Sequence, residues 1–376
     1  MDEAGTVYGY AVAVDPRGRL RYGHVDGRTA EFHPLWLRER APDPATTDPQ
    51  TGQRLIEAAD IPLDLAVTDA CVENDGVRLS FSDGHSTVFS FAVLDEAISG
   101  RAEERRLWGR DLTPLPQADA QAVVTDDAAL HAMLEALDRY GCVIVRGLAA
   151  TEDGMSPVVD RIGPLRRTNW GGIADVKAIP SAYDLTMTAR HLEKHADNPY
   201  RDPIPGYIFL HCIVNNAEGG DSEIADGFAV AERMRREHPE EFSILTTVRP
   251  RFRYVDETTH LEHEGPLIEL GSSGEVFRVR YSNRTETVDA LEPDVLDPYY
   301  RARARFHALI NSPEMTVQFK LGPGDMIVMD NYRLLHGRRG YKLETGMRHL
   351  RQGYVDRDTL QSRRRILARS HKKAVS

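Results

Sequence analysis

The sequence predicts a mainly β protein with helices, in which a small β-rich domain precedes a larger β-sandwich or jelly roll buttressed by helices. Two observations support this fold class: short apolar segments of strand length recur along the chain, and only a few long amphipathic helices separate them. The length of 376 residues also exceeds what one hydrophobic core usually serves. We expect a β-rich domain over 1–96, a linker over 97–124 and the larger domain over 125–376.

The first 96 residues are expected to form hairpins. The segments GRLRYGHVDGRTAEFHP (18–34) and GVRLSFSDGHSTVFSF (76–91) alternate apolar and polar residues around Asp-Gly turns. That alternation is the usual hairpin signal. Residues 97–124 are polar, charged and contain proline, so we expect a linker that packs on its neighbour through Trp108.

The larger domain is expected to begin with an amphipathic helix. Four apolar residues between 130 and 137 share one helical stripe, Thr125 or Asp126 can cap its start, and Gly141 can end it. A buried strand, CVIVRGL, follows. Two more helices are expected, one capped by Asp226 and stopped before Pro239, and one within 297–313. Further strands are expected at 206–214, 251–256, 275–281, 315–320, 325–330 and 347–354.

Bulk properties exclude several classes of protein. The net charge of -11 disfavours a general nucleic-acid binder. The basic cluster at 362–373 is interpreted as a solvated helix face, with nucleic acid or membrane as the alternative. Neither a signal peptide nor an apolar run of membrane-spanning length is visible, and the three cysteines lie far apart, so we expect a cytoplasmic protein. No Walker A, G-x-G-x-x-G or G-x-S-x-G motif is present.

One His-x-acid pair is a candidate metal site. The pair His195 and Asp197 precedes a Pro-bounded loop and the apolar strand GYIFLHCIV. Residues i and i+2 of an extended segment project to the same face, so both side chains could meet one ion. Such pairs are usually solvated surface pairs, and the chain contains five of them: His24/Asp26, His191/Glu193, His195/Asp197, His238/Glu240 and His260/Glu262.

A third ligand is found far downstream. His336 follows the apolar strand MIVMD and stands beside Gly337, although a hydrogen-bonded rim histidine is the alternative interpretation. Two histidines and one carboxylate form the facial triad of non-haem Fe(II) oxygenases, and zinc hydrolases can use the same ligand types. An oxygenase that uses 2-oxoglutarate also needs a cation for the distal carboxylate. Arg348 is that candidate, and Arg351 is its rival on the opposite face of the strand.

Four motifs together resemble a known family. The segments HADNPYRDPIPG, GGDSEIADGF, PGDMIVMDNYRLLHGRRGY and RHLRQGY resemble the γ-butyrobetaine hydroxylase branch of the Fe(II)/2-oxoglutarate dioxygenases, with trimethyllysine hydroxylase and the taurine dioxygenases as wider relatives. The resemblance covers nearly the whole chain. It implies a double-stranded β-helix (jelly roll) and iron held by His195, Asp197 and His336. It further implies 2-oxoglutarate bound by Arg348 and Ser222, with O2 as oxidant, succinate and CO2 as products, and a homodimer.

The N-terminal region departs from this pattern. The family carries a structural zinc there, held by cysteines and a later histidine. Here WLRERAPDPATTDPQ contains no cysteine, and His85 matches the histidine without its partners. One imidazole does not hold zinc usefully. We therefore predict no structural zinc, with hydrophobic packing around Trp36 and Leu37 in its place.

The substrate positions depart as well. Relatives surround a trimethylammonium group with aromatic rings and bind the substrate carboxylate with two asparagines. Here one ring is replaced by Ala174 and another by Met187, and the resemblance places Asp184 and Ser282 at the positions of the two asparagines. Arg190 and Arg201 could receive an anion, or could simply be solvated. The candidate substrate residues are Trp170, Asp184, Met187, Asn198, Ser282 and Tyr354.

We therefore expect an oxygenase that acts on a small zwitterion. The substrate would be a quaternary-ammonium or amino compound with a carboxylate or phosphonate, other than γ-butyrobetaine, in natural-product or phosphonate metabolism. The alternatives are a non-catalytic jelly-roll binding or sensor protein and a zinc hydrolase.

Overall fold

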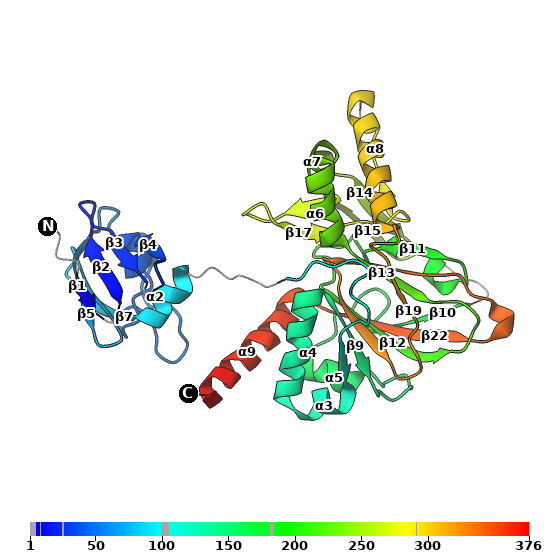
Figure 1. Cartoon of the computed structure of the whole chain (residues 1–376), viewed down its shortest axis with the longest axis horizontal. Helices are drawn as coiled ribbons and strands as arrows, with labels where there is room; N and C mark the ends of the chain where they lie inside the picture. The colour runs from blue at the N-terminus through cyan, green and yellow to red at the C-terminus, as the bar shows by residue number, and fades with distance from the viewer. Residues whose placement is uncertain are drawn as a thin grey trace. The chain divides into compact units, whose positions relative to one another are not determined.

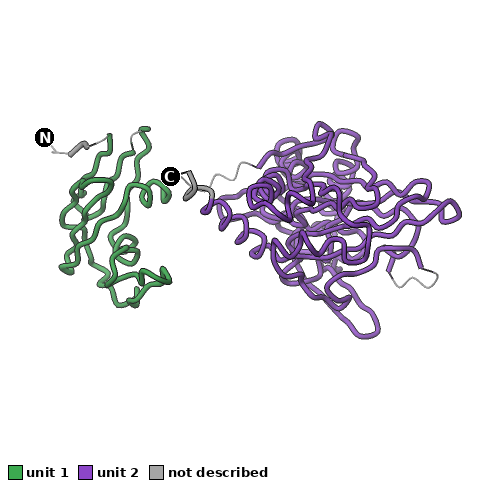
Figure 2. The backbone as a smooth tube through the Cα atoms, turned by 90° about the horizontal axis from the view of Figure 1, so that it is seen from below, with its two compact units in different colours: residues 1–102 green, residues 103–376 purple. Residues whose placement is uncertain are grey.

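The structure is a computed structural model of the chain, and it describes residues 5–7, 9–24, 26–98, 105–179, 184–290 and 292–375. The chain divides into two compact units, residues 1–102 and residues 103–376, which Figure 2 shows in different colours. Each unit has its own hydrophobic core.

The first unit contains two antiparallel sheets with short helices (Figure 1). Both predicted hairpins are confirmed, because β3 pairs with β4 and β6 pairs with β7. The elements are β1 (Gly5–Val7), β2 (Tyr10–Val14), β3 (Leu20–Gly23), β4 (Thr29–Phe32), α1 (Pro34–Arg38), a 3-10 helix (Ala58–Asp60), β5 (Val67–Glu73), β6 (Gly76–Phe81), β7 (Ser86–Ser90) and α2 (Phe91–Ile98).

The loop after α1, where the resemblance places zinc-binding cysteines, is held by polar contacts. His85 Nε2 lies 2.8 Å from Asp43 Oδ2, and Arg38 ties the loop to the hairpin that carries His85. Leu37 is fully buried and Trp36 is half-buried, as expected for hydrophobic packing. The prediction that hydrophobic packing alone replaces the zinc is therefore incomplete, because the contact between His85 and Asp43 also holds this loop to the neighbouring hairpin.

Replacing His85 with alanine should loosen this loop. A partly buried pair of this kind contributes on the order of 1 kcal/mol, so amide exchange in residues 39–57 should quicken by roughly fivefold. Hydrogen exchange followed by mass spectrometry on the full chain measures this, with 2-oxoglutarate turnover as the control that should not change. Adding a metal chelator should not change amide exchange in residues 39–57 of the wild-type chain. If the chelator made these amides exchange as fast as they do in the variant, a bound metal would be holding the loop.

The second unit is organised around a six-stranded sheet of order β10-β22-β12-β20-β9-β8. Its pairs are antiparallel except the parallel pair β8–β9. Successive residues of β20 alternate between two cores, with Met326 and Val328 on one face and Ile327 and Met329 on the other. Burial of both faces explains why this strand is apolar throughout. The strands are β8 (Gln117–Asp119), β9 (Cys142–Arg146), β10 (Ile173–Lys177), β12 (Tyr207–Asn215), β20 (Met326–Asp330) and β22 (Arg348–Val355).

A smaller sheet faces one side of this sheet. Ile208 and Leu350 from the larger sheet and Ile224 and Leu334 from the smaller sheet belong to one buried cluster. The predicted sandwich is therefore present as two sheets that share a core. The smaller sheet has the order β11-β21-β13-β19, with β11 (Leu192–His195), β13 (Ser222–Asp226), β19 (Val317–Phe319) and β21 (Leu334–Arg338).

Helices cover the other side of the larger sheet (Figure 1). The predicted first helix is confirmed: Asp126 accepts from the Ala128 N–H at 3.0 Å, and Gly141 follows with φ of 79°. That left-handed conformation is accessible to glycine at little cost. The covering helices are α3 (Ala120–Thr125), α4 (Asp127–Tyr140), α5 (Ser156–Ile162) and α9 (Arg357–Val375).

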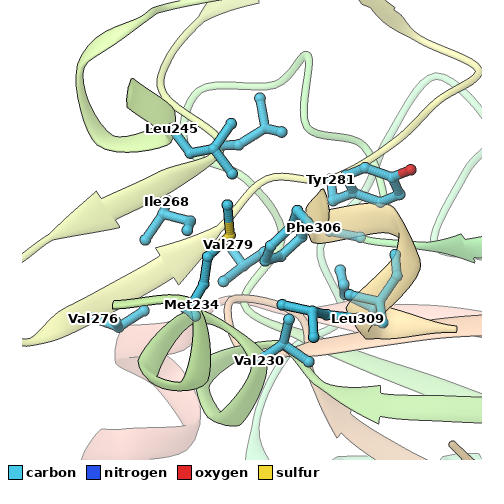
Figure 3. Packing of buried hydrophobic residues seen from close by; sticks show 14 of the residues in the cluster. Val230, Met234, Leu245, Ile268, Val276, Val279, Tyr281, Phe306 and Leu309 are labelled. Carbon is cyan, nitrogen blue, oxygen red and sulfur yellow. The ribbon is translucent and has the colours of Figure 1, made fainter. Parts of the chain in front are cut away.

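A second helical cluster packs beside the smaller sheet. Figure 3 shows Val230 and Met234 from α6 meeting Phe306 and Leu309 from α8 in one buried cluster. The elements of this region are α6 (Gly227–Glu237), α7 (Pro239–Thr247), β14 (Arg251–Val255), β15 (His260–Glu264), β16 (Ile268–Leu270), β17 (Val276–Val279), β18 (Glu286–Thr287) and α8 (Pro293–Ile310).

The expected packing of Trp108 on its neighbour is confirmed, because Trp108 is buried and its indole N–H donates to the Tyr140 carbonyl at 2.7 Å. The described residues of the predicted linker over 97–124 otherwise differ from the prediction. Leu112 and Leu115 are also buried, and β8 joins the large sheet. These apolar anchors outweigh the polar composition, so residues 105–124 belong to the second unit.

The helix predicted to be capped by Asp226 and to stop before Pro239 is confirmed, because α6 ends at Glu237. Pro239 then begins α7, since proline suits the first turn of a helix. One helix boundary differs from the prediction. Helix α8 begins at Pro293, before the predicted residue 297. The basic cluster at 362–373 lies on α9, as expected. Within the described chain, none of the helices has the length and apolar character needed to cross a bilayer.

Candidate active site

Three predicted ligands converge between two neighbouring strands. His195 is the last residue of β11, and Asp197 lies two residues further along the chain. His336 lies in the middle of β21 and is directly paired with His195. The candidate ligand atoms of the three side chains all lie within 4.8 Å of one another. Two imidazoles and one carboxylate at this spacing can bind a single metal ion.

Gly337 allows β11 to approach β21 at this point. A Cβ atom at Gly337 would lie 2.6 Å from the Leu192 carbonyl oxygen, which is closer than real contacts allow. Any larger residue would therefore push β11, and with it His195, away from His336. The small residue that the sequence places beside His336 has a steric purpose.

The orientation and electrostatics of the three side chains suit metal binding. The Glu193 carbonyl lies 2.8 Å from His195 Nδ1 and accepts its N–H, which orients the ring with Nε2 3.3 Å from Asp197 Oδ1. Burial, together with the charges of His195 and Arg284, lowers the pKa of His336 to about 4. Burial alone would raise the pKa of Asp197, but the neighbouring histidines and a tyrosine hydroxyl hold it below its usual range. A neutral His336 imidazole and an ionised Asp197 carboxylate are the forms that bind a metal ion.

Asp197 is also held by its surroundings. Its backbone N–H donates to Asn331 Oδ1 at 2.8 Å, and its carbonyl accepts from Asn331 Nδ2 at 3.0 Å. On the side chain, Oδ2 accepts from the Tyr354 hydroxyl at 2.9 Å and from the Gln352 amide. These contacts orient the carboxylate from the large sheet, so both sheets contribute to the site.

A narrow inner cavity adjoins the three ligands and contains two buried arginines. Arg348 and Arg338 both line it, as does Ser222. Burial, with the charge of Arg338 nearby, lowers the pKa of Arg348 to about 10, so it remains charged at neutral pH. Among the residues that the structure describes, neither arginine has an acidic partner within ion-pair distance. Two buried cations without a counter-ion favour an anionic ligand.

The rival arginine lies elsewhere. Arg351 forms ion pairs with Glu152 at 3.2 Å and with Asp175 at 3.3 Å, and it does not line the inner cavity. Arg348 instead donates from Nε to the Gly220 carbonyl at 3.2 Å. Gly220 has φ of +72°, and a Cβ there would lie 3.0 Å from the Arg348 side chain. Glycine thus both fits the turn and leaves room for the arginine.

A larger cavity of about 820 Å³ opens on the other side of the ligands. His195 and Asp197 lie in its wall, so a molecule within it can reach the metal position. All six predicted substrate residues line it as well: Trp170, Asp184, Met187, Asn198, Ser282 and Tyr354.

The cavity contains two aromatic rings that the sequence reasoning missed. Tyr200 and Tyr254 line it together with Trp170 and Tyr354. Tyr254 stacks on Tyr200 with ring centroids 5.3 Å apart and meets Trp170 edge-on at 5.2 Å. Although Ala174 and Met187 lack the rings of the relatives, Tyr200 and Tyr254 supply two other aromatic rings to the cavity. Tyr200 lies only three residues after Asp197, which was a signal that could have been used.

A charged pair also lies in the wall. Arg284 lines the cavity, and its Nη1 is 3.7 Å from Asp184 Oδ1. The arginines proposed from the sequence are engaged elsewhere, because Arg190 pairs with Glu193 at 3.2 Å and Arg201 lies over the Trp170 ring at 5.5 Å. Neither lines the cavity. Arg284 had no distinguishing signal in the sequence.

Comparison with known proteins places this site in a family. Residues 108–354 match the model described as taurine catabolism dioxygenase TauD, TfdA family. Residues 17–95 match the model described as gamma-butyrobetaine hydroxylase-like, N-terminal. The resemblance inferred from the motifs is thereby confirmed.

Two dioxygenase relatives agree with the family match. The chain is 33% identical to the gamma-butyrobetaine dioxygenase of Pseudomonas sp. (strain AK-1), over 92% of each chain. It is 26% identical to the mitochondrial trimethyllysine dioxygenase of Gallus gallus, over 93% of this chain and 87% of the relative. A solved taurine dioxygenase from Burkholderia xenovorans is 18% identical with a TM-score of 0.48, covering 61% of this chain and 82% of that one.

These matches decide between the alternatives left open by the sequence. The relatives that match this chain over most of their length are dioxygenases. They therefore support neither a zinc hydrolase nor a non-catalytic sensor. The His-Asp-His cluster is the donor set that such chemistry requires. The chain therefore belongs to the TauD/TfdA family of dioxygenases and is an enzyme that depends on Fe(II), 2-oxoglutarate and O2.

Proposed function

We propose that His195, Asp197 and His336 hold the iron and that Arg348 and Ser222 bind the distal carboxylate of 2-oxoglutarate. The support is the clustered set of two imidazoles and one carboxylate, and the uncompensated charge of Arg348 in the adjoining cavity. In this proposal residues 125–376, extended back to 105, form the dioxygenase domain. Its two facing sheets would be the double-stranded β-helix.

When bound, iron together with 2-oxoglutarate and O2 supplies an oxidant that can attack an unactivated C–H bond. The contribution of the chain is to position the reactants and exclude water. Tyr354 has two tasks, because its hydroxyl orients Asp197 while its ring lines the substrate cavity. Leu210, Ile224 and Phe319 line the inner cavity and keep that end apolar around the arginines.

The substrate is proposed to be a small zwitterion with a quaternary-ammonium or amino group and a carboxylate or phosphonate. The observation that carries this is one cavity containing two of the metal ligands and four aromatic rings. Such rings attract a cation through their π faces. The expectation that γ-butyrobetaine itself is excluded has no support from the relatives, which include a γ-butyrobetaine dioxygenase.

Succinate formation from 2-oxoglutarate and Fe(II) should therefore be stimulated by such compounds. A suitable panel is γ-butyrobetaine, trimethyllysine and 3-(trimethylammonio)propylphosphonate, with pentanoate as the control that lacks the cation. We expect at least one zwitterion to raise turnover by roughly tenfold or more, as a correctly placed substrate does. Failure of every ammonium compound to stimulate succinate formation would refute the proposed substrate class, whether or not pentanoate stimulates it.

Three further expectations remain predictions about the protein as a whole. The first unit is proposed to work without zinc, through the contact between His85 and Asp43. A homodimer, expected from the resemblance, can be checked by light scattering. The absence of nucleic-acid and membrane partners and a cytoplasmic location can be checked by binding assays and fractionation.

A further inference from the structure

Arg284 occupies a rigid position in the wall of the substrate cavity. It lies in a turn in which the Ser282 carbonyl accepts from the N–H groups of Thr285 and Glu286, at 3.2 and 3.1 Å. The same segment is hydrogen-bonded to the backbone between two of the proposed metal ligands, because the Ala196 N–H donates to the Tyr281 carbonyl at 2.8 Å. Ala196 stands between His195 and Asp197 in the sequence. The turn that carries Arg284 is therefore held beside the metal position.

Among the residues that the structure describes, none accepts a hydrogen bond from the Arg284 guanidinium. Its side chain is only 19% exposed, and its nearest acid among the described residues, Asp184, is 3.7 Å away. That distance is too long for a hydrogen bond. Asp184 Oδ1 already accepts from the Thr186 N–H at 2.8 Å and from the Thr186 hydroxyl at 2.7 Å. Asp184 thus attracts Arg284 without occupying its five N–H groups.

We infer that Arg284 is the receptor for the anionic group of the substrate, and that Asp184 positions it. This inference rests on the proposed function, because it names the group that recognises one end of the zwitterion. A planar guanidinium can donate two parallel hydrogen bonds to a carboxylate or a phosphonate. The ammonium end would meet Trp170, Tyr200 and Tyr254, which lie in the same cavity.

This assignment explains how the cavity can bind an anion beside an aspartate. Where the resemblance places two uncharged asparagines, this chain has Asp184 and Ser282, and Asp184 alone would repel an anion. The charge of Arg284 offsets that repulsion. A charged receptor should also favour a fully ionised group over an amide more strongly than two neutral amides would.

Arg253 provides a matched control. It is the other arginine of the cavity wall, but its side chain is exposed rather than half-buried. Exposed charges are screened by water and contribute little. The two arginines thus differ in burial while sharing residue type and cavity.

The experiment is calorimetric titration of the full chain with Fe(II) and 2-oxoglutarate under nitrogen. The probes are γ-butyrobetaine, its primary amide and 3-(trimethylammonio)propylphosphonate. Wild type should bind at least one of the two anions more tightly than the amide, and the tighter anion identifies the group. Arg284→Gln should weaken the binding of that anion by roughly 10- to 100-fold, as expected for charge-assisted hydrogen bonds, and leave the amide unchanged. Arg253→Gln should behave as wild type.

Several outcomes would overturn the inference. It fails if wild type binds the amide as tightly as both anions, or if Arg284→Gln keeps the preference for the anion. An equal loss for amide and anion would assign Arg284 a structural role and would also contradict it. Failure to bind any of the three probes would contradict it too. The proposed function fails separately, through the absence of succinate formation with every ammonium compound of the panel.

Discussion

Replacing His336 with alanine is expected to reduce substrate-stimulated succinate formation by more than about 100-fold, beyond the usual cost of losing a residue that only supports a metal ligand. His336 supplies one of three ligand atoms that lie within 4.8 Å of one another. With two ligands left, iron should bind more weakly as well. Ferrous binding under nitrogen and succinate release, measured on the same preparation, check both effects.

His260→Ala is the matched control for this variant. His260 belongs to another of the His-x-acid pairs, with Glu262, but its side chain is 58% exposed on β15. Its loss should change succinate formation by less than about twofold, because surface substitutions rarely matter. Wild-type turnover by His336→Ala, in a variant that keeps the wild-type unfolding temperature, would disprove the assignment of the metal ligands.

Replacing Arg348 with glutamine should raise the KM for 2-oxoglutarate by roughly 10- to 100-fold, the effect of removing charge-assisted hydrogen bonds from a carboxylate. Arg348 is 6% exposed, lines the inner cavity with the metal ligands, and has no acidic partner among the described residues. Removing it leaves no unpaired acid behind. The loss should therefore appear in co-substrate binding rather than in folding, and steady-state kinetics with varied 2-oxoglutarate measure it.

Arg351→Gln tests the alternative position on the same strand. Arg351 pairs with Glu152 and Asp175 outside the inner cavity, so its loss should alter the KM for 2-oxoglutarate by less than about twofold. The reverse result, in which only Arg351→Gln raises this KM, would assign the co-substrate carboxylate to the other face of β22.

The candidate metal ligands could be predicted from the sequence because their signals are local. His195 and Asp197 are two residues apart, at the end of β11 and in the bend that follows it, and His336 closely follows an apolar strand. The four-residue stripe and caps of α4 are equally local, and both were found as predicted. Arg348 and Arg351 could be separated by the two-residue period of a strand.

The residues that were missed depend on contacts between distant segments. Tyr254 comes from β14 and Trp170 from the loop before β10, and no periodicity links them. The position of Arg284 in the cavity depends on the contact between Ala196 and Tyr281 and on its distance to Asp184. Neither is visible in the sequence around Arg284. The extent of the predicted linker was wrong for a similar reason, since β8 within it pairs with β9 of the larger sheet.

The sequence by itself determined the family, the cofactors and the candidate metal ligands, because residue spacing along regular backbone defines which side chains share a face. The tertiary structure decided which side chains complete the substrate cavity and which arginine can meet an anion there. Strand pairing and loop packing bring those groups together from distant segments, such as those of Trp170 and Tyr254 or of Asp184 and Arg284. Hydrophobic periodicity describes one segment at a time and therefore does not reveal which distant segment it contacts.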